Sequence, residues 1–177
     1  MASVNRQDYF DCGFQILATQ GYGGLRLTSL CKQLRVTTGS FYNWFRNWDD
    51  FVDQFLEYWI AERTENVAVT ASALRDPVER LVVLQQFATE TPHAAEVAMR
   101  AWSSIDQRVR RVQEHVDQAR LELIESALRD LGVPSPLAGR LAAYGLSLVI
   151  GHQHLHPDQM TWSLTHFITL AQLHAES

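Results

Sequence analysis

Apolar residues recur along the chain at the three-to-four-residue spacing of amphipathic helices. In the segment 5–20, Phe10, Phe14 and Leu17 follow the i, i+4, i+7 spacing of one helical face. No segment combines β-branched residues with the two-residue alternation of a strand, and no Asn-Gly pair predicts a hairpin. The pattern predicts an all-α protein of about nine helices.

Capping residues, glycines and prolines set the expected helix boundaries. Thr28 and Thr37 are typical N-cap residues, the Gly21–Gly24 run ends the first helix, and Pro77 suits the first turn of another. We therefore expect helices over residues 5–20, 28–34, 37–45, 49 onward, 77–91, 93–104, 106–131, 136–155 and 157 onward. This order predicts a three-helix domain over residues 1–48 and a helical bundle over residues 49–177.

The segment 27–51 predicts a helix-turn-helix. Two short helices joined by a turn at Arg35 and Val36 cannot bury their apolar faces alone, so the first helix must cover them. In such motifs the last helix enters the DNA major groove with its N-terminal residues.

This segment resembles the TetR family of bacterial transcriptional regulators. The run VTTGSFYNWF at 36–45 is similar to the family signature almost position by position. Gly21 and Tyr22 match the glycine and aromatic residue that end the first helix of the family, and Asp49 and Asp50 match the acidic start of its fourth helix. The resemblance covers residues 5–55. The family often has glycine at the turn between the two short helices, where this chain has Arg35, and this difference predicts either a right-handed turn conformation there or local strain. It implies a homodimer that binds a palindromic operator in double-stranded DNA, acts as a repressor, and releases DNA when a small-molecule effector binds.

The resemblance also implies which residues contact DNA. They are Thr28, Thr37, Thr38, Gly39, Ser40, Tyr42, Asn43, Trp44, Arg46 and Trp48. The family usually has a phosphate-binding lysine where this chain has Trp48, and Arg46 is the candidate substitute. The alternative for Tyr42, Trp44 and Trp48 is ordinary packing, and the alternative for the polar residues is a solvated helix face.

Charge is distributed unevenly along the chain. The net charge is −5, which by itself argues against binding to DNA. Residues 1–48, however, contain five basic and two acidic side chains, whereas residues 49–177 contain ten and eighteen. Because phosphate contact depends on local charge, the N-terminal segment remains suited to DNA.

For the bundle, the resemblance implies a dimer interface and an effector pocket. The predicted interface residues are Leu141, Gly145, Leu148, Leu164, Phe167 and Ile168. The predicted pocket residues are Trp59, Phe87, Met99, Trp102, Tyr144 and Trp162. Internal core is the alternative for every one of them.

The sequence gives few signs of redox, metal or catalytic chemistry. Cys12 and Cys31 lie at apolar helix positions, where two core thiols are expected rather than a redox pair. His152, His154 and His156 alternate, and on a helix that spacing cannot converge on a metal, so we expect no metal site. We expect no cofactor and no enzyme activity, because no phosphate loop, HExxH motif or catalytic triad order is present. No apolar run is long enough for a membrane span or a signal peptide, so we expect a cytoplasmic protein.

Overall fold

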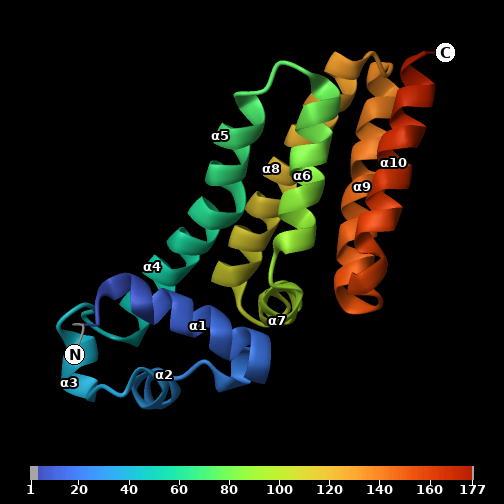
Figure 1. Cartoon of the computed structure of the whole chain (residues 1–177). Helices are drawn as coiled ribbons and strands as arrows, with labels where there is room; N and C mark the ends of the chain where they lie inside the picture. The colour runs from blue at the N-terminus through green and yellow to red at the C-terminus, as the bar shows by residue number, and fades with distance from the viewer. Residues whose placement is uncertain (1–3, 177) are drawn as a thin grey trace. The chain divides into compact units, whose positions relative to one another are not determined.

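The computed structural model describes residues 4–176, and over this range it contains ten α-helices and no strand. The helices are α1 (Arg6–Gln20), α2 (Leu27–Leu34), α3 (Thr38–Tyr42), α4 (Trp48–Ile60), α5 (Asn66–Ser72), α6 (Pro77–Glu90), α7 (His93–Ser103), α8 (Gln107–Leu131), α9 (Ser135–His154) and α10 (Met160–Ala175). Three short turns of helix lie between them, at Tyr22–Gly24, Ala61–Glu65 and Pro157–Gln159. The all-α prediction is confirmed (Figure 1).

The chain divides into two compact units. The first runs up to residue 61 and also takes residues 92–113, and the second takes residues 62–91 and everything from residue 114 onward. The first unit therefore includes α4 and α7 in addition to the three helices α1, α2 and α3. The boundary drawn at residue 48 separates expected functions rather than packed units, and it stays a prediction.

In the first unit, α1 begins and ends where the sequence indicates. The side chain of Asn5 accepts hydrogen bonds from the backbone N–H of Gln7 (2.8 Å) and of Asp8 (3.2 Å). Asp8 in turn accepts from the N–H of Asn5 (2.7 Å), which completes a capping box. Gly21 then ends the helix with φ +66°, a conformation that glycine adopts without steric cost.

Phenylalanine rings form the core of the first unit. Phe10 on α1, Phe41 on α3, Phe45 just beyond α3, and Phe51 and Phe55 on α4 are each buried. The ring centroids of Phe41 and Phe45 are 4.8 Å apart, and those of Phe45 and Phe51 are 5.1 Å apart. This cluster fixes the short helix α3 against the two longer ones, because five residues of helix have little stability of their own.

The turn between α2 and α3 is strained. Arg35 has φ 56° and ψ 42°, and within residues 4–176 it is the sole non-glycine residue with positive φ. Of the two expectations for this position, the right-handed turn is wrong and the strained one is confirmed. The left-handed conformation lets the N–H of Arg35 reach the carbonyl of Lys32, and the N–H of Val36 reach that of Cys31.

Replacing Arg35 with glycine is expected to stabilise the protein. The left-handed conformation costs an ordinary residue about 1–2 kcal/mol, and the extra backbone entropy of glycine offsets part of that gain. We expect the free energy of unfolding to rise by up to about 1 kcal/mol in urea denaturation. Lys32→Gly, inside α2, is the matched control and should lower it by about 0.5–1 kcal/mol. A loss of stability in Arg35→Gly would contradict the strain.

Several helix boundaries differ from the sequence prediction, and α10 begins at Met160, after a short helical turn, rather than at residue 157. Arg26, and not Thr28, occupies the N-cap of α2, and its side chain makes no capping hydrogen bond. The third helix ends at Tyr42 rather than at Phe45. The long fourth helix is interrupted by a π-helical turn at Ala61–Glu65, which separates α4 from α5 and raises the number of helices from nine to ten over the described residues.

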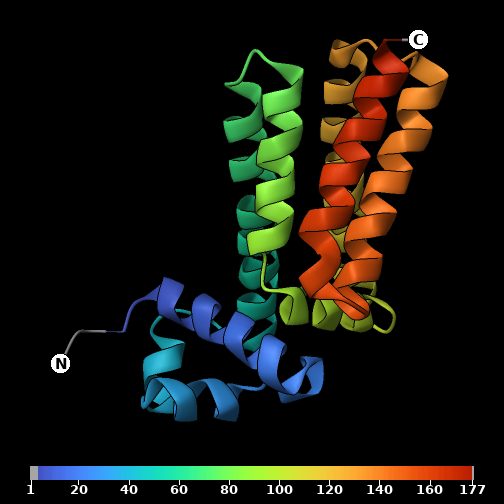
Figure 2. The same cartoon turned by 45° about the vertical axis from the view of Figure 1, so that its right-hand side comes forward.

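The second unit has a separate aliphatic core. Leu81 of α6, Leu128 of α8, Leu141 of α9 and Phe167 of α10 are buried in it. In Figures 1 and 2, α9 and α10 lie side by side in opposite directions. A Cβ at Gly145 would lie 3.0 Å from the ring of Phe167, so the glycine permits this close approach. Among the helices of the described range, none combines the length and apolar character of a membrane span.

Candidate nucleic-acid interface and effector cavity

The helix α3 is fixed from beneath by its own aromatic residues. Phe41 is fully buried, and its ring packs edge-on against that of Tyr9 with centroids 5.8 Å apart. Tyr9 also packs edge-on against Phe45 at 5.5 Å. Because Phe41 faces the core, the residues on either side of it in α3 face outward.

The start of α3 is ordered by Thr37. Its hydroxyl accepts a hydrogen bond from the backbone N–H of Ser40 (3.2 Å) and lies 3.1 Å from the Ser40 hydroxyl. Thr37 and Thr38 are exposed and Ser40 is half-buried. The exposed Gly39 has only the Thr37 hydroxyl near its missing Cβ, at 3.6 Å, so the fold itself does not require a glycine there. A glycine at this position does permit another molecule to approach the backbone closely.

Three further predicted contact residues lie on the outside of this segment. Tyr42 is 54% exposed, and its ring packs edge-on against that of Phe41 with centroids 5.4 Å apart. Asn43 is exposed, and Trp44 is 44% exposed. Thr28, the second residue of α2, is also exposed. These side chains are accessible to a partner molecule.

Trp48 has a packing role. It is half-buried, its ring stacks on that of Phe41 with centroids 6.2 Å apart, and it lies 5.0 Å from the ring of Phe51. The packing alternative named for Trp48 therefore accounts for its position. Contact with DNA remains a prediction for this residue.

Arg46 extends into solvent but has an acidic partner. Its side chain is 86% exposed, and its guanidinium lies 3.0 Å from the Asp50 carboxylate. The same carboxylate accepts a hydrogen bond from the backbone N–H of Arg46 at 2.8 Å. These bonds lower the pKa of Asp50 to about 2. A DNA phosphate at Arg46 would have to share the guanidinium with Asp50.

Removing the Arg46 side chain is expected to raise the pKa of Asp50 toward its ordinary value, about 3.9. In the folded protein the lowered pKa stabilises the structure above pH ~4, and this contribution is lost as the pH falls through about 2. An NMR titration of the Asp50 side chain in Arg46→Ala measures the shift. Arg26→Ala is the control and should leave the Asp50 pKa unchanged. An unaltered pKa in Arg46→Ala would contradict the pairing.

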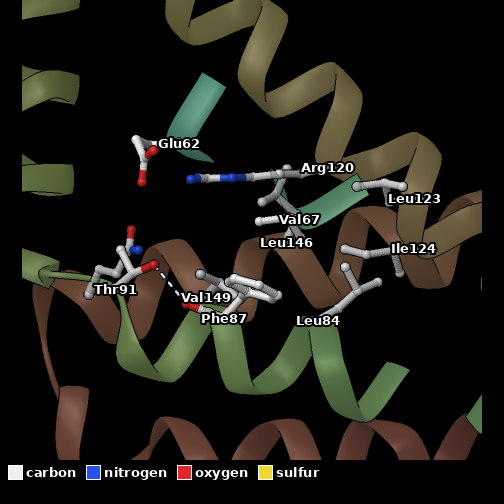
Figure 3. A pocket seen from close by; sticks show the side chains of 12 residues that line it. Glu62, Val67, Leu84, Phe87, Thr91, Arg120, Leu123, Ile124, Leu146 and Val149 are labelled. Atoms are coloured by element: carbon white, nitrogen blue, oxygen red, sulfur yellow. Dashed lines mark hydrogen bonds between the residues drawn. The ribbon is translucent and has the colours of Figure 1, made fainter. Parts of the chain in front are cut away.

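The second unit contains a cavity of about 80 Å³ (Figure 3). Its wall is mostly apolar and includes Val67, Leu84, Phe87, Ile124, Leu146 and Val149. The polar side chains in the wall are Glu62, Thr91, Arg120 and Gln153. A mostly apolar wall with a few polar groups is typical of small-molecule sites.

The structure separates the six predicted pocket residues. Of these, Phe87 alone lines the cavity. Trp59 and Met99 are fully buried in the first unit, and Trp102 is half-buried there. Tyr144 is 48% exposed and Trp162 is 71% exposed. Periodicity marked these residues as apolar, but it carried no information about which helix faces enclose a hollow.

The six predicted interface residues contribute to the core of their own chain. Leu141, Gly145, Leu164, Phe167 and Ile168 are buried, and Leu148 packs against the core of the second unit. The large apolar residues that α9 and α10 leave exposed are others. They are Tyr144, Trp162 and Leu173.

The thiols and histidines have structural partners. Cys12 and Cys31 are buried, and burial raises the pKa of each, that of Cys12 to about 11. Such thiols stay protonated and poorly reactive. His152 lies 2.7 Å from the Ser163 hydroxyl, and His154 lies 2.9 Å from the carbonyl of Ile150. Within the described residues, no group of three metal-ligating side chains comes together.

No family model and no curated protein matches the sequence. Solved structures do match the fold over nearly the whole chain. A transcriptional regulator from Saccharomonospora viridis, solved with choline, superposes with TM-score 0.77 at 18% identity, covering 93% of this chain and 95% of its own. FadR from Bacillus subtilis, solved with stearoyl-CoA, superposes with TM-score 0.67 at 14% identity. The match covers 94% of this chain and 97% of the FadR chain.

A TetR-family transcriptional regulator from Rhodococcus sp. is similar at the same level. Its TM-score is 0.75 at 15% identity, with 94% of this chain and 98% of that chain covered. At such low identity the match concerns the fold, and its coverage includes both units. The chain therefore has the fold of TetR-family transcriptional regulators.

Proposed function

We propose that the protein is a TetR-like transcriptional regulator and that α3 is its recognition helix. The observation that carries the proposal is the outer face of α3 and the residues just after it. Thr38, Gly39, Tyr42, Asn43 and Trp44 are exposed there, while Phe41 beneath them is fully buried. A rigid helix that presents short polar side chains, a glycine and a tyrosine is suited to the major groove and its phosphates.

A homodimer on a palindromic operator follows from this proposal. The three N-terminal helices of one chain carry few basic groups, so tight binding to DNA needs two chains on one duplex. The exposed faces of α9 and α10 support such a pairing. On α10, Trp162 and Leu173 are exposed eleven residues apart, and Trp162 stacks on His166 with ring centroids 5.6 Å apart. On α9, Tyr144 lies among small exposed residues, which permits close helix packing.

The proposed mode of action is repression relieved by a small molecule bound in the cavity of the second unit. Similar proteins have been solved with choline and with stearoyl-CoA, which supports the capacity of this fold for ligands. A ligand releases DNA if it binds the DNA-incompetent conformation more tightly than the competent one. We propose that the protein works in the cytoplasm without catalysing a reaction.

The test is fluorescence anisotropy with duplexes that tile the DNA upstream of the gene. We expect one duplex to bind in preference to the others, with affinity that falls steeply as salt rises, and with two chains per duplex by light scattering. A chain that binds every duplex alike, or none, would refute the regulator proposal. Monomeric binding to a single half-site would refute the dimer alone.

A further inference from the structure

Gln153 contributes an unsatisfied buried acceptor to the cavity wall. It lies on α9, is 5% exposed, and its side-chain oxygen Oε1 has no hydrogen-bond partner in the part of the chain that the structure describes. Burying such a group without a partner is unfavourable. The Oε1 atom of Gln153 is therefore suited to accept a hydrogen bond from a ligand.

The other polar groups of the wall favour a donor without net charge. The Thr91 hydroxyl donates its hydrogen to the carbonyl of Phe87 at 2.7 Å and can then only accept from a ligand. The charges of Glu62 and Arg120 are opposite. Figure 3 shows Glu62, Thr91 and the end of the Arg120 side chain toward one side of the hollow. A charged head of either sign would meet a like charge there, Glu62 or Arg120, whereas a hydroxyl can donate to Gln153 and still accept.

The remainder of the wall suits a short apolar chain. Figure 3 places Leu84, Leu123 and Ile124 on the side away from the polar groups. A second hollow of about 40 Å³ shares Leu84, Ala88, Ile124 and Val149 with the first. Movement of these shared side chains would join the two into a space of about 120 Å³. A cavity of roughly 150 Å³ holds benzene, so a slim alkyl chain enters the joined space only with some further opening of its wall.

We infer that this cavity binds a short amphipathic molecule with an uncharged, hydrogen-bond-donating head, such as a primary alcohol. The head donates to Gln153 Oε1, and the alkyl chain lies between α6, α8 and α9. The inference rests on the proposed function only in that the bound molecule would be the effector. Gln153 is then the residue that determines specificity for the head group.

The test compares two probes of equal chain length, 1-hexanol and hexanoate. Ligand-observed NMR titrations with the full chain measure the dissociation constant of each at pH 7. We expect 1-hexanol to bind at least 10-fold more tightly than hexanoate. Equal affinities, tighter binding of hexanoate, or no binding of either probe would overturn the inference.

Gln153→Leu separates the specificity of the head group from the volume of the cavity. Leucine removes the orphan acceptor, so we expect 1-hexanol to bind about 5-fold or more weakly and the melting temperature to rise by a few degrees. Gln118→Leu, an exposed position on α8, is the matched control and should bind 1-hexanol as the wild type does. Unchanged affinity for 1-hexanol in a folded Gln153→Leu variant would refute the role of Gln153.

The outcome for the cavity and the outcome for the proposed function are read separately. Binding of 1-hexanol with no effect on DNA affinity supports the cavity assignment and refutes relief of repression through it. Sequence-preferring DNA binding without binding of either probe refutes the cavity assignment and leaves the regulator proposal standing.

Discussion

Thr38→Glu is expected to lower operator affinity by about 100-fold or more while the protein stays folded. Thr38 is exposed at the first position of α3, where an acidic residue is favourable for the helix because of its dipole. In the proposed complex, however, the same carboxylate would face DNA phosphates. Loss of one good contact costs about 1–3 kcal/mol, and a dimer loses two of them.

Anisotropy on the preferred duplex measures this loss, and circular dichroism checks the fold. Glutamine has nearly the same shape as glutamate but no charge, so Thr38→Gln should lose far less affinity for the duplex than Thr38→Glu. Gln118→Glu makes the same change of net charge on an exposed part of α8 and should leave affinity within about 3-fold. If Thr38→Glu binds the duplex as the wild type does, α3 is not the recognition helix.

Phe41→Ala is expected to destabilise the first unit by about 3–5 kcal/mol, the usual cost of truncating a buried phenylalanine to alanine. Phe41 is fully buried, and its ring contacts those of Tyr9, Phe45 and Phe51 at centroid distances of 4.8–5.8 Å. Its removal leaves a hollow beneath α3, so we expect operator binding to be lost together with stability.

Urea denaturation followed by tryptophan fluorescence measures the change in free energy of unfolding. Tyr42→Ala is the matched control, since Tyr42 is the next residue of the same helix and is 54% exposed. It should cost less than about 1 kcal/mol in stability and still weaken DNA binding. A loss below about 1 kcal/mol in Phe41→Ala would contradict the aromatic core as the support of α3.

The spacing of apolar residues, together with a few capping and helix-ending residues, determined much of the secondary structure. Asn5 and Gly21 bound α1 as expected, and Pro77 begins α6. These features are local, because a cap or a glycine acts on the backbone within one turn of itself. The run at 36–45 likewise placed the turn and the exposed helix, since its motif joins residues that are neighbours in sequence.

Tertiary structure alone decided which apolar residues enclose a cavity and which remain exposed. Phe87 lines the cavity, whereas Trp59 is buried in the first unit and Trp162 is exposed on α10. All three sit at apolar positions of helices, so periodicity could not separate them. Gln153 was missed because a polar residue near a helix end usually faces solvent, and its burial depends on how α9 packs against its neighbours. Burial is set by contacts between residues far apart in sequence, and a single sequence does not contain those distances.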